Sequence, residues 1–67
     1  TNQSSSKKES IERTIFELEE RISEAEKGLI ENANNPDFEV LNQLNAGLKE
    51  FIKQRDEAYA EWERFLD

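Results

Sequence analysis

The stretch NANNPD, residues 32–37, divides this 67-residue chain into two segments. Asparagine favours turns and left-handed backbone conformations. Proline cannot continue a helix, although it suits the first turn of a new one. Apolar residues recur with helical spacing on both sides of the stretch. We therefore predict two helices that are joined by a turn over about residues 33–37.

The segment before the turn carries one narrow line of apolar residues. Their spacing alternates between four and three residues, which is typical of a helix in a coiled coil. The line consists of Ile11, Ile15, Leu18, Ile22, Ala25 and Leu29. This pattern predicts a first helix over about residues 10–32.

The segment after the turn has a wider apolar face. Its main line has the same alternating spacing, with one charged interruption, and consists of Leu41, Leu44, Leu48, Phe51, Arg55, Ala58, Trp62 and Phe65. A second line at a spacing of seven residues runs beside it and consists of Ile52, Tyr59 and Leu66. We predict a second helix over about residues 38–66.

Two helices of this kind with a short connection pack antiparallel. The expected fold is all-α, a two-helix antiparallel coiled-coil hairpin over residues 10–67. A register that pairs Leu29 with Leu44 near the turn also pairs Ile11 with Trp62 at the far end.

The same register places Gly28 and Gly47 on one flank, which suggests a close approach of the two backbones there; two unrelated surface glycines fit the sequence equally well. Arg55 must carry its charge to water or to a carboxylate, and Glu19 and Glu12 are the expected partners.

The first nine residues, TNQSSSKKE, contain no large apolar side chain. Such a stretch buries too little surface to offset the entropy lost when it is ordered. We predict that residues 1–9 form a linker or a disordered lead-in.

The composition excludes several classes of protein. Nine basic residues against sixteen acidic ones give a net charge of -7, which is unlike a strong nucleic-acid binder. Cysteine and histidine are absent, so the commonest metal ligands and the commonest general base are missing. Two glycines are too few for a phosphate-binding loop. We predict no catalytic, cofactor or metal site, and no membrane-spanning segment.

Two groups of residues are candidates for binding. The line of Ile52, Tyr59 and Leu66 is a candidate docking surface, and widening of the core explains it equally well. The candidate phosphate contacts are the basic residues Lys7, Lys8 and Arg64 at the open end of the hairpin, together with the pair Lys49 and Lys53. Acidic neighbours surround each of these basic groups, which weakens them as phosphate sites.

The sequence around the turn and at the end of the second helix resembles a known family. Residues 35–38 read NPDF, residues 56–66 read DEAYAEWERFL, and residues 18–22 of the first helix read LEERI. These motifs are similar to the C-terminal coiled-coil domain of ABC-F ATPases of the Uup-like group. The resemblance covers roughly residues 8–67.

The resemblance implies a cytoplasmic parent protein with two cassettes that bind ATP and magnesium, and a role on the ribosome in translation or antibiotic resistance. This chain is then a non-catalytic accessory domain that contacts the ribosome, nucleic acid or the parent's ATPase cassettes. Two alternatives stay open, a generic structural coiled coil for self-association and a weak DNA-binding module. The expected state is a monomer or a weak homodimer.

Overall fold

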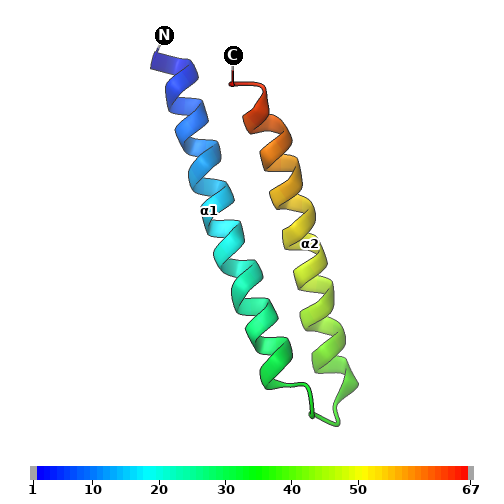
Figure 1. The fold of residues 1–67 in the computed structure, drawn as a ribbon. Helices are drawn as coiled ribbons and strands as arrows, with labels where there is room; N and C mark the ends of the chain where they lie inside the picture. The colour runs from blue at the N-terminus through cyan, green and yellow to red at the C-terminus, as the bar shows by residue number, and fades with distance from the viewer. Residues whose placement is uncertain (1, 67) are drawn as a thin grey trace.

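The computed structural model describes the backbone of residues 2–66 and the side chains of residues 6–66. Two helices, α1 (Asn2–Glu31) and α2 (Phe38–Glu63), run side by side in opposite directions (Figure 1). They form a rod 54 Å long and 14 Å by 13 Å across. The start of α1 and the end of α2 lie at the open end of the rod, and the turn lies at the other end. The predicted two-helix antiparallel hairpin is confirmed.

Helix α1 begins earlier than we expected. Its first residue is Asn2 rather than a residue near position 10, so most of the expected linker over residues 1–9 is helical. Once a helix exists, each added residue forms one more backbone hydrogen bond, and only that residue loses its conformational freedom. Residues 2–9 contain neither glycine nor proline to stop this extension, and the extension requires no buried side chains.

Helix α2 ends at Glu63, three residues before the expected end. The amides of Arg64, Phe65 and Leu66 donate to the carbonyls three residues earlier, at 3.0–3.2 Å. These tighter bonds satisfy carbonyls that the end of an α-helix leaves free.

Asparagine side chains organise the turn. The backbone amide and the side-chain Nδ2 of Asn32 both donate to the carbonyl of Gly28, at 3.0 and 2.8 Å. Asn35 Nδ2 donates to Asn32 Oδ1 at 3.2 Å, and Asn35 Oδ1 accepts from the amide of Asp37 at 2.9 Å. Asp37 then caps α2, since its carboxylate accepts from the amide of Glu39 at 3.0 Å.

The turn does not use the left-handed conformations that asparagine favours, because no residue in the described part of the turn has a positive φ angle. Asparagine shapes this connection through its side-chain hydrogen bonds instead.

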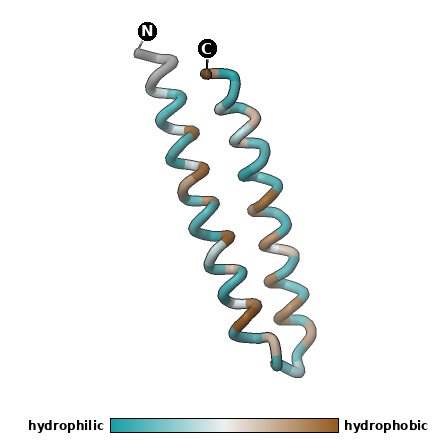
Figure 2. Tube along the Cα trace, viewed as in Figure 1, coloured by the Kyte–Doolittle hydropathy of each residue, from teal (hydrophilic) through white to brown (hydrophobic). Residues whose placement is uncertain are grey.

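The core of the hairpin is thin and one-sided. Its buried apolar residues are Ile15, Leu18 and Ile22, all on α1 and 6–7% exposed, whereas α2 has no buried residue among those described. Figure 2 shows apolar positions recurring among polar ones along both helices. Helix α1 therefore covers only part of the wide apolar face of α2.

Contacts across the helices support the expected register. Lys8 Nζ lies 5.8 Å from the centroid of the Trp62 ring, and Trp62 Nε1 donates to Glu12 at 2.9 Å. Ile11 lies between Lys8 and Glu12 on α1, where its pairing with Trp62 requires it to be.

The glycines do not approach each other. A Cβ atom built on Gly28 would lie 3.4 Å from a methyl group of Leu44, and one built on Gly47 would have no heavy atom within 4 Å. The side chain of Leu44 occupies the space beside Gly28, so the expected close approach of the two backbones is wrong.

Candidate functional site

The candidate docking surface lies on one flank of the hairpin and is partly open to solvent. Leu66 is 51% exposed and Tyr59 is 37% exposed, whereas Ile52 is half-buried. Phe38, two heptads before Ile52 along α2, continues the same line and is 75% exposed. We call this flank, defined by Ile52, Tyr59 and Leu66, the stripe flank. It carries large apolar groups that α1 leaves uncovered.

Tyr59 also connects the two helices. Its hydroxyl donates to the Glu19 carboxylate at 3.0 Å, and its ring meets the Trp62 ring edge-on, with centroids 6.4 Å apart and an interplanar angle of 87°. This geometry is favourable for an aromatic pair. Tyr59 is therefore both a surface residue and a contact within the hairpin.

The Glu19 carboxylate raises the pKa of the Tyr59 hydroxyl above its ordinary value. The hydrogen bond is the main cause, because ionisation would remove the donor. Desolvation raises the pKa further, as does the repulsion between a tyrosinate and Glu19, and the positive charge of Arg55 acts in the opposite direction.

Arg55 does not pair with the expected acids. Its Nη2 lies 3.3 Å from the Asp56 carboxylate, the next residue along α2. Tyr59 bonds Glu19 and Trp62 bonds Glu12, so both expected partners already accept a hydrogen bond from α2. The prediction of Glu19 or Glu12 as the partner of Arg55 is therefore wrong.

Sequence reasoning missed the acids of α1 that border the stripe flank. Glu12, Glu19 and Glu26 recur at a spacing of seven residues and are exposed. We call them the acidic row. The bond between Glu19 and Tyr59 places Glu19 beside the stripe, and the seven-residue spacing places Glu12 and Glu26 on the same side of α1 as Glu19. The seven-residue spacing was the signal that could have identified this row.

The candidate phosphate contacts do not form one patch. Lys8 lies against the Trp62 ring and is half-buried, whereas Lys7 and Arg64 are exposed at the open end. Lys49 and Lys53 are exposed on α2, and Lys53 lies 11 residues, or about 16 Å, before Arg64. The structure therefore divides these five residues between two separate places.

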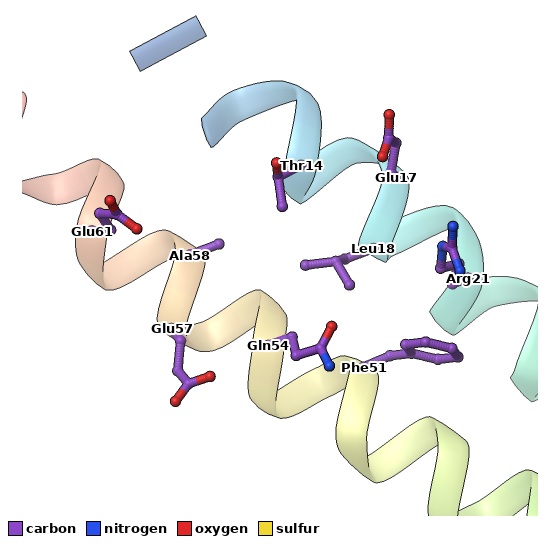
Figure 3. A pocket seen from close by; sticks show the side chains of 9 residues that line it. All are labelled: Thr14, Glu17, Leu18, Arg21, Phe51, Gln54, Glu57, Ala58 and Glu61. Atoms are coloured by element: carbon purple, nitrogen blue, oxygen red, sulfur yellow. The ribbon is translucent and has the colours of Figure 1, made fainter. Parts of the chain in front are cut away.

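A groove of about 390 Å³ lies between the helices on the opposite flank. Figure 3 shows Leu18 and Phe51 pointing into the space between α1 and α2, while Glu17 and Glu57 point away from it. The Arg21 guanidinium lies 6.0 Å from the centroid of the Phe51 ring, within range of a cation–π contact. The small side chain of Ala58 leaves this space open.

The chain matches the family described as the ABC transporter C-terminal domain over residues 2–65. This match spans almost the whole chain and includes both helices and the turn. The chain belongs to this family.

The family match confirms the resemblance to the C-terminal domain of an ABC protein that the motifs at the turn and at the end of α2 indicated. No curated protein and no solved structure matches this ABC transporter C-terminal domain. Neither α1 nor α2, as far as the structure describes them, is apolar enough over a sufficient length to cross a membrane.

Proposed function

We propose that this ABC transporter C-terminal domain is the non-catalytic accessory hairpin of a cytoplasmic ABC-F ATPase. It docks through the stripe flank on a protein surface, either on the parent's own cassettes or on the ribosome. In this role the hairpin positions the ATPase and takes no part in ATP hydrolysis. The family match and the motif resemblance support the parentage.

The observation that carries the proposal is the uneven packing of the two helices. The buried residues among those described lie on α1, and the apolar face of α2 continues past the contact line to Tyr59 and Leu66. A large apolar group on a surface stabilises a complex when a partner removes it from water. The stripe flank is therefore the part of this hairpin best suited to a protein contact.

Charge favours protein over nucleic acid as the partner. The chain carries a net charge of -7, and the acidic row borders the stripe. Phosphate groups bound at this flank would lie near three carboxylates, whereas nucleic-acid binding requires clustered basic residues. The candidate basic residues lie in two separate places, at the open end of the hairpin and in the middle of α2.

The proposal is tested in a full-length ABC-F protein that ends in this domain. Leu66→Ser removes an exposed apolar group from the stripe flank, and Phe16→Ser removes one that is 60% exposed on α1, away from the stripe. Association with ribosomes is measured by sedimentation, and association with the separately expressed cassettes by pull-down. We expect Leu66→Ser to weaken one of these associations at least fivefold and Phe16→Ser to leave both unchanged.

Equal effects of the two substitutions would contradict the proposal, because docking would then not depend on the stripe flank. Normal association of the Leu66→Ser protein with both partners would contradict it as well. Far-ultraviolet circular dichroism of the isolated domain checks that each variant is still helical.

A further inference from the structure

We propose that the partner segment seated on the stripe flank is a basic amphipathic helix, which packs as a third helix against Ile52, Tyr59 and Leu66 and directs lysine or arginine side chains at Glu12, Glu19 and Glu26. This inference rests on the proposed docking function and names the chemical class of the partner. The surface combines an apolar line from one helix with an acidic line from the other.

The two lines run at the same pitch. The stripe and the acidic row each repeat every seven residues, which is about 10 Å along a helix. A third helix that lies along the hairpin with its own apolar residues in heptad spacing presents its flanking side chains at the same interval. Apolar contacts and ion pairs can therefore form together over the whole length of the contact.

Two carboxylates of the acidic row meet uncharged donors within the hairpin. Glu12 and Glu19 accept hydrogen bonds from Trp62 Nε1 and the Tyr59 hydroxyl, and both donors are neutral. Among the described side chains, the ion pair joins Arg55 to Asp56, within α2, and involves no member of the acidic row. The hydrogen bonds fix two carboxylates at the edge of the apolar line, and they leave the negative charge for a partner.

Other occupants fit this flank less well. A second copy of the chain would bring its own acidic row against this one, and each copy carries a net charge of -7. A neutral apolar helix would bury the stripe but would leave three carboxylates at its edge without opposite charges. Complementary charge at the rim of an apolar contact provides selectivity among such partners and speeds association.

The test uses this 67-residue chain and two synthetic peptides of about 21 residues, a length that spans the acidic row. Both peptides have leucine at the apolar heptad positions; one has lysine at the flanking positions and the other has glutamate. Trp62 is the only tryptophan of the chain and lies beside Tyr59, so its fluorescence reports binding at the stripe. Amide chemical shifts in nuclear magnetic resonance spectra locate the bound peptide.

The decisive variants remove three charges from one line of glutamates. The first triple variant combines Glu12→Gln, Glu19→Gln and Glu26→Gln. It keeps oxygen acceptors for Trp62 and Tyr59 and removes the negative charges of the acidic row. The matched control changes Glu17, Glu24 and Glu31 to glutamine, because these glutamates have the same seven-residue spacing on another face of α1. At low salt we expect the first triple variant to lose at least tenfold in affinity for the lysine peptide and the control triple to lose less than threefold.

Several outcomes would overturn the inference. Failure of the lysine peptide to bind would do so, as would equal losses in the two triple variants, since the attraction would then be general. If the glutamate peptide bound as well as the lysine peptide, and Leu66→Ser weakened the binding of both, the inference of a basic partner would be wrong. Docking at the stripe flank would still be supported. If the lysine peptide bound and Leu66→Ser had no effect, the stripe itself would be wrong, and the proposed function would fall with it.

Discussion

Tyr59 is the only tyrosine of the chain, and its hydroxyl donates to the Glu19 carboxylate of the other helix at 3.0 Å. Trp62, the only tryptophan, forms the corresponding bond to Glu12 at 2.9 Å. These two bonds join residues 40 and 50 positions apart and help to hold α1 and α2 in register. In both bonds a neutral aromatic donor meets a carboxylate, which makes one of them sensitive to high pH.

The first prediction concerns the ionisation of Tyr59. Its pKa is higher in the folded chain than in the unfolded chain, so the bond to Glu19 stabilises the fold below the unfolded pKa of about 10. This stabilisation is lost as the pH rises through the folded pKa. We expect the stability difference between the natural chain and Tyr59→Phe to disappear over this range. The ultraviolet absorbance of tyrosinate follows the titration directly.

Glu19→Gln is the control for this titration. It keeps an acceptor for the hydroxyl and removes the negative charge, so we expect it to lower the pKa of Tyr59 towards the ordinary value. An unchanged titration curve in Glu19→Gln would show that the negative charge of Glu19 does not perturb the pKa of Tyr59.

The second prediction concerns Gly47, which lies within α2 with open space at the position of a Cβ atom. We expect Gly47→Ala to stabilise the hairpin by about 0.5–1 kcal/mol, because alanine is the better helix former. Gly28→Ala should gain less, since its Cβ would meet Leu44 at 3.4 Å. Urea denaturation measures both changes. A destabilised Gly47→Ala variant would mean that the two backbones lie closer there than the structure shows.

At the scale of the elements, each helix end is formed differently. The turn uses side chains of Asn32, Asn35 and Asp37, whereas the end of α2 uses tighter backbone bonds. Proline at position 36 and the cap at Asp37 start α2 in a fixed direction. The turn therefore determines where the second heptad pattern begins, and through it the register.

The third prediction tests the cap of α2. Asp37→Ala removes the acceptor for the Glu39 amide, and we expect a loss of about 1 kcal/mol of folding free energy. Asp37→Asn keeps an acceptor and should lose much less. The midpoint of urea denaturation compares the two variants. Equal losses would show that the charge of Asp37, rather than its hydrogen bond, stabilises the helix.

The fourth prediction concerns Arg55, the charged residue in the main apolar line of α2. Its side chain is 31% exposed and pairs with Asp56, which is 65% exposed. Ion pairs in such positions contribute little to stability. We expect Arg55→Leu to be neutral or stabilising in a thermal melt, and to raise the pKa of Tyr59 further because a nearby positive charge is lost. A loss of more than about 2 kcal/mol would show that the hairpin depends on the charge.

On the scale of the whole molecule, residue spacing alone predicted the two helices, the turn and the antiparallel packing. The heptad lines that end at Leu29 and begin again at Leu41 are long and regular, so tertiary contacts had little to override. The start of α1 was not predictable in the same way, because the absence of apolar residues does not stop a helix from extending.

The candidate site was only partly visible in the sequence. The line of Ile52, Tyr59 and Leu66 follows from its spacing, and its exposure required the structure. Arg55 pairs with Asp56, its neighbour in α2, rather than with an acid of α1, and a spacing rule cannot choose among side-chain rotamers. The hydrogen bonds from Tyr59 to Glu19 and from Trp62 to Glu12 also depend on side-chain rotamers. The sequence did not show that these two glutamates already accept hydrogen bonds from α2, so the partners of Arg55 were predicted wrongly.

Docking through the stripe flank requires that Leu66, its most exposed member, adds little to the fold of the hairpin itself, and the free energy of unfolding of the 67-residue chain tests this claim most directly. Leu66 is 51% exposed, whereas Ile15 is 6% exposed in the core. We predict that Leu66→Ser costs less than about 1 kcal/mol, as exposed substitutions do. Ile15→Ala, the control, should cost about 2–5 kcal/mol. If Leu66→Ser destabilises the chain as much as Ile15→Ala, the stripe belongs to the core and the claim is contradicted.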